Sequence, residues 1–153
     1  MKLISYFFSS IFAFVFFLSL VIFHPFQWIG LKIGYQSHKN VVDILNWILT
    51  KSLIIIGNTV HFKVTHPIPE NTTIIFVANH QGLFDIPPII WYLRKYHSKF
   101  VSKIELGKGI PSISFNLKYG GAALINRKDP KQALTEIKEF GQRVHKNKWS
   151  ATI

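Results

Sequence analysis

The residue types best suited to chemistry in this chain are a histidine and a carboxylate five positions apart, His80 and Asp85. A histidine can act as a general base because the pKa of a free imidazole, about 6.5, lies close to working pH. It needs one fixed tautomer, which a carboxylate bonded to the other ring nitrogen supplies. The pair would form a two-member relay that takes a proton from a substrate hydroxyl. The alternative is that both are surface polar residues or helix caps.

The chain must turn between the two residues if their side chains are to meet. In a continuous helix this spacing separates them by about 140°, and Gly82 makes a turn easy. The preceding run, Thr73–Ala78, is apolar and β-branched, which is typical of a strand buried on both faces. A helix is expected over Phe84–Tyr96, with two prolines in its first turn. Functional groups gather at such strand ends in open α/β sheets.

The rest of the second half alternates strand and helix signals. Asp129 and Pro130 predict the N-cap and first position of a helix that runs to Lys146, and Gly107–Ser114 interrupts regular structure. An α/β domain is therefore expected. Its further strands are predicted at Thr59–Thr65, Lys99–Ser102, Ala122–Asn126 and Trp149–Ile153.

The N-terminal segment Leu3–Phe23 carries no ionisable charge at neutral pH. About 20 apolar residues suffice to cross a bilayer as a helix, so we expect a membrane anchor. A signal peptide and a buried core helix are the alternatives. The run exceeds the usual apolar region of a signal peptide, about 7–15 residues, and no small-residue cleavage site follows. His24 and Pro25 are expected to end the helix.

A second apolar stretch, Val41–Ile56, has helical periodicity with a polar stripe at Asp43, Asn46 and Thr50. It predicts an amphipathic helix that lies on the membrane or docks against the first helix. An amphipathic helix that packs on the domain core would have the same pattern, so the sequence does not distinguish between these alternatives. Between the two stretches lie residues suited to a membrane–water interface, namely Trp28, Lys32, Tyr35, His38 and Lys39.

Composition narrows the classes of function. The 153 residues are 48% apolar and 16% charged, with a formal net charge of +11, which favours anionic partners such as lipid head groups, phosphorylated substrates or nucleic acid. The chain has no cysteine, which excludes disulfides, thiolate zinc sites and a cysteine nucleophile. The histidines have no convincing metal-ligand spacing, so no metal and no bound cofactor are expected.

Several motifs together resemble the glycerolipid acyltransferases, the 1-acylglycerol-3-phosphate (lysophosphatidate) acyltransferase family. Asn79, His80 and Asp85 match its N-H-x-x-x-x-D signature. Lys103–Leu106 is similar to its K-x-E-L element, followed by Pro111, and Gly120–Arg127 is similar to its glycine-rich block. The motifs come in the family's order. Together with the N-terminal hydrophobic anchor, which is usual in the family, the resemblance covers essentially the whole chain. The resemblance implies a mixed sheet flanked by helices, with residues 1–58 as membrane anchor and interfacial helix and 59–153 as the N-terminal portion of the acyltransferase domain.

The resemblance also implies roles for residues. His80 is the base, Asp85 orients it, and Arg127 with Lys103 holds the phosphate of the acceptor. The acceptor is lysophosphatidic acid, the acyl donor is acyl-CoA or acyl carrier protein, and the product is phosphatidic acid. The implied location is the bacterial inner membrane with the site facing the cytoplasm, although Lys2 on one side of the apolar run and Lys32 on the other do not fix its orientation.

Two departures from the family stand out. Gly82 occupies a position where many relatives have serine, which leaves the base and its partner in place. The chain also stops after Trp149–Ile153, before the family's F-P-E-G-T-R block, so we expect a C-terminally incomplete fold, either a fragment of a longer enzyme or the product of an interrupted gene. The 153-residue form by itself is expected to be inactive or aggregation-prone. The alternative function is an inactive, truncated membrane-bound remnant that binds anionic lipid. Nucleic-acid binding rests on charge alone and is not expected.

Overall fold

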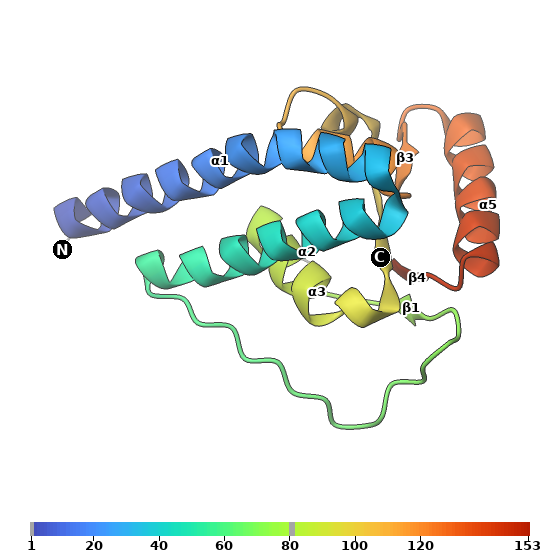
Figure 1. Ribbon diagram of the computed structural model, residues 1–153, viewed down its shortest axis with the longest axis horizontal. Coiled ribbons are helices and arrows are strands. Elements are labelled where there is room, and N and C mark those ends of the chain that lie inside the picture. Colours follow the sequence, from blue (N-terminus) through green and yellow to red (C-terminus); the bar gives the residue numbers. More distant parts are fainter. Residues whose placement is uncertain (1, 80–81) are drawn as a thin grey trace. The chain divides into compact units, whose positions relative to one another are not determined.

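The computed structural model describes residues 2–79 and 82–153, whose contacts divide the chain into two units (Figure 1). The helical unit consists of Met1–Lys63 and Gly82–Tyr92. The sheet unit consists of Val64–Gln81 and Leu93–Ile153. The chain therefore passes between the units within the His80–Asp85 motif.

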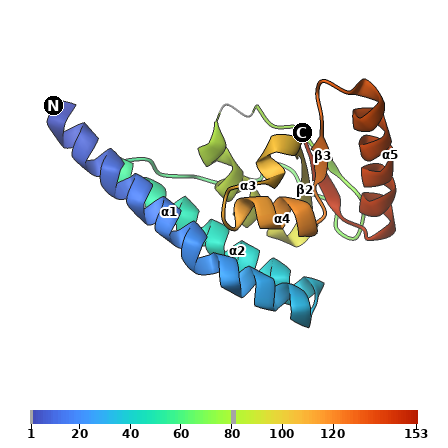
Figure 2. The ribbon, with the colours of Figure 1, turned by 90° about the horizontal axis from the view of Figure 1, so that it is seen from above.

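Two long helices lie side by side as an antiparallel hairpin in the helical unit (Figure 1, Figure 2). Helix α1 spans Lys2–Ile33 and α2 spans Tyr35–Ser52. A 3-10 turn, η1 (Leu53–Ile56), follows α2. The chain reverses at Gly34, whose φ of 149° is a conformation that other residues rarely adopt.

The prediction that His24 and Pro25 end the first helix is wrong, because α1 continues through Pro25 to Ile33. Proline removes one hydrogen bond and disfavours helical geometry in the residue before it, but this is a preference that packing can override. In the continuation, Gln27 is buried and Gly30 lies against the backbone of His38 in α2. Packing on α2 therefore compensates for the local cost of the proline.

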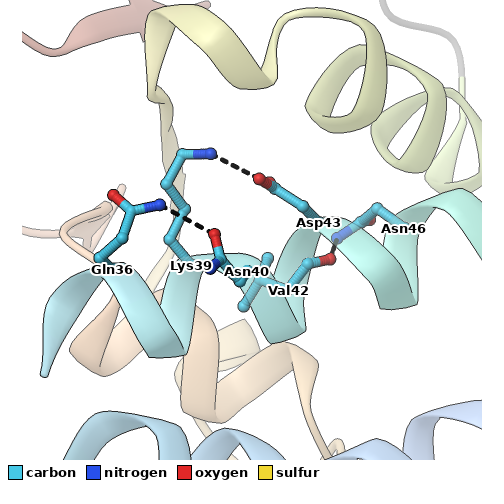
Figure 3. A network of polar contacts seen from close by, with 6 residues as sticks. All are labelled: Gln36, Lys39, Asn40, Val42, Asp43 and Asn46. Atoms are coloured by element: carbon cyan, nitrogen blue, oxygen red, sulfur yellow. Dashed lines mark hydrogen bonds and ion pairs between the residues drawn. The ribbon is translucent and has the colours of Figure 1, made fainter. Parts of the chain in front are cut away.

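The predicted polar stripe of the second helix faces inward rather than outward. Asn46 and Thr50 are 6% and 7% exposed, whereas Ile44 and Trp47 are exposed. The Asn46 amide donates to the Val42 carbonyl at 2.7 Å (Figure 3). The Thr50 hydroxyl donates to the Asn46 carbonyl, also at 2.7 Å. These bonds to the helix's own backbone allow the polar side chains to be buried. Docking of this helix against the first one is confirmed.

The first turns of α2 carry a charged pair that is mostly buried. Nζ of Lys39 lies 2.5 Å from Oδ2 of Asp43, and the two side chains are 12% and 13% exposed (Figure 3). Gln36 donates to Asn40 one turn earlier, at 2.8 Å. Burial, and then the negative charge of Asp43, raise the pKa of the Tyr35 hydroxyl above its ordinary value. Tyr35 is therefore neutral at physiological pH.

The helix predicted over Phe84–Tyr96 is divided into three short pieces. They are the 3-10 turn η2 (Leu83–Asp85), helix α3 (Ile86–Tyr92) and the 3-10 turn η3 (Arg94–Tyr96). Both prolines lie in the first turn of α3, as predicted, where their missing N–H groups leave no helical bond unmade.

The strand predicted at Thr59–Thr65 does not form. Instead, the ring of Phe62 stacks on Tyr92 at 4.9 Å between centroids, and the Tyr92 hydroxyl donates to the Val60 carbonyl at 3.5 Å. Alternation of residue types favours a strand only where a partner strand is available to take the backbone hydrogen bonds. Here a tyrosine of α3 supplies the contact.

The sheet unit contains four parallel strands in the order β1-β4-β2-β3. They are β1 (Ile75–Phe76), β2 (Ser98–Lys103), β3 (Ala123–Ile125) and β4 (Ser150–Thr152). All are predicted strands, and β4 lies inside the sheet. The expected mixed sheet is corrected to a parallel one in the described residues, because the strands are joined by crossovers that contain helices rather than by hairpins.

Strand β1 is not buried on both faces as predicted, since Ile75 is 65% exposed. It is an edge strand whose only pairing among the described strands is with β4. That pairing extends past the strand's ends, through the N–H of Ala151 to the Ile74 carbonyl and the N–H of Ala78 to the Ile153 carbonyl, at 2.9 and 3.0 Å.

Besides η3, the described residues of the sheet unit contain three more helical segments: the 3-10 turn η4 (Ile104–Gly107), α4 (Ile113–Tyr119) and α5 (Pro130–Lys146). Helix α5 has the predicted bounds, and its N-cap is confirmed because the Asp129 carboxylate accepts from the N–H of Gln132 at 3.1 Å. Its buried side chains Phe140 and Val144 form the core with Ala123 and Ala151 of the sheet.

Candidate functional site

The carboxyl ends of the parallel strands place polar residues along one edge of the sheet. Lys103 is the last residue of β2 and is in register with Ile125, the last residue of β3. Arg127 follows two positions later, and Asn79 lies three positions beyond the end of β1. Parallel strands end at the same edge, so this edge is where an α/β sheet offers a ligand site.

Lys103 and Arg127 are exposed, and neither forms an ion pair with a described residue. Both cations are therefore available to an anion from solution. An arginine guanidinium can bind two phosphate oxygens through parallel, charge-assisted hydrogen bonds. The arrangement suits a phosphorylated ligand at the end of β2 and β3.

The turn that carries Arg127 is held by side chains on both sides of it. The Asn126 side-chain oxygen accepts from the N–H of Lys128 at 3.0 Å. Gln132 of α5 accepts from the N–H of Asn126 at 2.8 Å and donates to the Leu124 carbonyl at 3.1 Å. Sequence reasoning missed Gln132, although a glutamine three positions after the N-cap Asp129 has the spacing of a capping box.

The segment after Lys103 is fixed by one serine that sequence reasoning also missed. The Ser114 hydroxyl donates to the Leu106 carbonyl at 2.8 Å and accepts from the N–H of Ile110 at 3.0 Å. These bonds close the loop between η4 and α4. Within η4, Gly107 lies so close to Leu124 of β3 that an added Cβ would stand 2.8 Å from a methyl group.

The second glycine of the Gly120–Arg127 block, Gly121, serves packing. Gly121 has a φ of 95°, and a Cβ on it would stand 2.7 Å from Cζ3 of Trp149. Nζ of Lys99 lies 4.7 Å from the centroid of the same Trp149 indole. Trp149 precedes β4, so this contact connects the residues that lead into β3 with those that lead into β4, two strands between which β2 lies in the sheet.

Asp85 lies in the helical unit, at the end of η2. Its carboxylate accepts from the N–H of Gly82 at 2.9 Å, and its own N–H donates to the Gly82 carbonyl at 3.1 Å. A turn does occur here, but Gly82 is not needed for it. The φ of Gly82 is −162°, which any residue adopts, and the space around it is open, so the serine of relatives would fit.

His80 and Gln81 lie outside the described residues, so the pairing of His80 with Asp85 stays a prediction. Within the described part of the chain, no group of three or more histidine, aspartate or glutamate side chains is placed to hold a metal ion.

Beside Asp85, Phe84 packs on α1. Its ring centroid lies 5.1 Å from that of Phe12 and 5.4 Å from that of Phe16. This contact was not predicted, since nothing in the sequence links a phenylalanine of the motif to one particular turn of the N-terminal helix.

Comparison with known families identifies one match. Residues 59–153 match the model of the family described as Acyltransferase. That range begins after η1 and includes the histidine–aspartate motif, Lys103 and Arg127. Searches of curated proteins and of solved structures found no match.

Proposed function

Because the chain belongs to the acyltransferase family, we propose that it esterifies 1-acylglycerol-3-phosphate. A fatty acyl group would pass from acyl-CoA or acyl carrier protein to the free hydroxyl of this lipid, giving phosphatidic acid in phospholipid synthesis. The observation that carries the proposal is the family match over the whole segment that contains the His80–Asp85 motif. No bound cofactor is part of it.

In the proposed reaction His80 takes the proton of the acceptor hydroxyl while Asp85 orients the imidazole. The hydroxyl oxygen attacks the thioester carbonyl, forming the new C–O bond. The C–S bond then breaks, and the proton passes from the imidazole to the departing thiolate. Acyl transfer therefore needs no nucleophile from the protein, which agrees with the absence of cysteine.

The acceptor's phosphate would bind Arg127, with Lys103 beside the same sheet edge. Support comes from the exposure of both cations at the carboxyl ends of adjacent strands and from the side chains that fix the Arg127 turn. A phosphate monoester carries close to two negative charges at neutral pH, so paired cations favour it over a neutral alcohol.

We also propose that α1 attaches the protein to a membrane, the bacterial inner membrane, with the site on the cytoplasmic side. By length and composition, Leu3–Ile33 can cross a bilayer, and 17% of its most apolar window is buried, which is low for a core helix. Near its end, Nζ of Lys32 lies 3.7 Å from the centroid of the Trp28 ring, a pair suited to the interface.

The test is an acceptor series on membranes that contain the protein, expressed with any sequence that follows residue 153 in its reading frame. The donors are a radiolabelled acyl-CoA and, separately, acyl carrier protein loaded with the same labelled acyl group. Lysophosphatidic acid should be acylated at least about tenfold faster than lysophosphatidylcholine, whose phosphate is a blocked diester with one charge fewer. Equal rates for the two would refute the proposed acceptor. Binding to anionic vesicles without any acyl transfer would instead indicate an inert lipid-binding protein.

A further inference from the structure

We propose that Phe84 is a positioning residue that ties the carboxylate of Asp85 to α1. The inference rests on the proposed function, in which Asp85 orients the catalytic base. In this proposal α1 helps to position a residue of the site as well as attaching the protein to the membrane. All the contacts involved lie inside the helical unit.

The three rings form one aromatic cluster. Phe84 meets Phe12 at an interplanar angle of 73° and Phe16 at 84°, both edge-to-face arrangements. Phe12 and Phe16 lie 5.7 Å apart on successive turns of α1 and are 5% and 4% exposed. Edge-to-face pairs stabilise an aromatic contact beyond the effect of burial. The contacts with Phe12 and Phe16 therefore hold the Phe84 ring in one position against this face of α1.

The fixed position of the Phe84 ring restricts the position of Asp85, the next residue. Asp85 and Gly82 exchange two hydrogen bonds across η2, so the turn moves as one piece and carries the carboxylate with it. Immediately afterwards α3 begins, and it packs on α2. The turn is thus held on one side by the Phe84 ring and on the other by α3. Removing the ring releases the first of these restraints.

Phe84 is 44% exposed, so it is not a core residue whose loss would unfold the unit. A small displacement of a group that orients a catalytic base can nevertheless cost about 100-fold in rate. Truncating the ring should therefore affect turnover far more than stability. This difference separates positioning from a purely structural role.

The contact itself is tested by cross-linking, since the chain has no cysteine of its own. The pair Phe12→Cys and Phe84→Cys should be joined by a short bifunctional thiol reagent in membranes. The matched control pair, Phe14→Cys and Phe84→Cys, should not be joined, because Phe14 on the same helix is 68% exposed. Equal cross-linking of both pairs, or none in the first, would overturn the contact.

Kinetics test the role. Phe84→Ala should lower kcat at least about tenfold and change the acceptor KM less than about twofold, because positioning acts on the transition state. Phe84→Leu, which keeps an apolar side chain against Phe12 and Phe16, should recover most of the loss in kcat. Phe14→Ala should keep kcat within about twofold. A loss confined to KM, or an equal loss in Phe14→Ala, would overturn the role.

A double-mutant cycle shows whether Phe84 acts through Asp85. With Asp85→Asn already present, Phe84→Ala should reduce the residual kcat by less than about threefold, because the group it positions is gone. Fully multiplicative losses would contradict the proposal. If the unchanged protein has no transferase activity, the proposed function falls and this role with it. Turnover that Phe84→Ala leaves intact removes only the role of Phe84.

Discussion

Arg127 and Lys128 are exposed neighbours in one turn, yet only Arg127 is assigned to the acceptor phosphate. Arg127→Ala should raise the KM for lysophosphatidic acid about tenfold, because one charge-assisted contact to a phosphate is worth about 1.5–3 kcal/mol. The KM for the acyl donor should change less than twofold.

Lys128→Ala is the matched control, since it removes one positive charge from the same turn and leaves the turn's backbone bonds in place. Steady-state kinetics in detergent–lipid mixed micelles provide both constants. A larger rise in the KM for the acyl donor would indicate that Arg127 binds the donor rather than the acceptor.

At the level of single residues, the sequence alone identified Lys103, Arg127 and Asp85 as site candidates, and the structure places the first two at the end of adjacent strands. It did not identify Gln132 or Ser114, because their hydrogen bonds join segments whose proximity depends on the folded sheet. A side chain's function can be guessed from its type, whereas its supporting contacts require the tertiary structure.

Among the elements, the entry to β3 depends on the contact of Gly121 with Trp149. Gly121→Ala should destabilise the sheet unit by about 2–4 kcal/mol, since it adds both a strained φ and a clash. Gly109→Ala is the control. Gly109 has a φ of 84°, but its surroundings are open, so this variant should be destabilised by backbone strain alone, about 1–2 kcal/mol.

Thermal unfolding and limited proteolysis of the two variants compare these losses. If Gly109→Ala proves as unstable as Gly121→Ala, the Trp149 contact contributes nothing and the glycine is required for its backbone alone.

The hairpin of α1 and α2 should lose stability at alkaline pH through Tyr35. Its raised pKa means that the folded form keeps the phenol proton above pH 10, where the unfolded chain releases it. The contribution of the protonated phenol is complete below about pH 10 and declines as the pH rises further.

Tyr35→Phe has no proton to lose, so its melting temperature should fall less between pH 9 and pH 11 than that of the unchanged protein. Circular dichroism of the helical signal in detergent measures both. The same alkaline decline in both proteins would show that Tyr35 is not its cause.

Element types were more predictable than their ends and faces. Helix α5 was predicted with its observed bounds because a cap and a proline mark its start. The end of α1 was misplaced because packing beyond Pro25 is a tertiary effect. The inward face of α2 was missed because Asn46 and Thr50 bond to their own helix, which periodicity does not reveal.

For the whole molecule, the central physical feature is a long helix that keeps apolar residues exposed. Phe17→Asp, at a site 60% exposed in α1, should markedly reduce the membrane-bound fraction. A carboxylate in the apolar part of a membrane-embedded helix costs up to about 2.5–3.5 kcal/mol on the insertion scale.

The control is Leu134→Asp, at a site 72% exposed on α5, which should leave attachment unchanged. Sedimentation of membranes, followed by quantification of bound and free protein, gives the result. Equal behaviour of the two variants would show that α1 is not the attachment site.

At this scale the sequence predicted an α/β domain behind an apolar helix, and the family match extends over residues 59–153. It did not predict that Gly82–Tyr92 would pack with the N-terminal helices. Phe84 contacts Phe12 of α1, and Tyr92 stacks on Phe62. Both contacts join distant parts of the chain, so the sequence pattern near Gly82–Tyr92 does not reveal them.

The most direct test of the proposed acyl transfer is the rate of phosphatidic acid formation in membranes that contain either the unchanged protein, expressed with any sequence that follows residue 153, or its His80→Ala variant. Loss of a general base costs at least about 100-fold, so the variant should fall to background while its membrane-bound fraction stays the same. A His80→Ala variant that keeps more than a few per cent of the activity would contradict the assignment of His80 as the base.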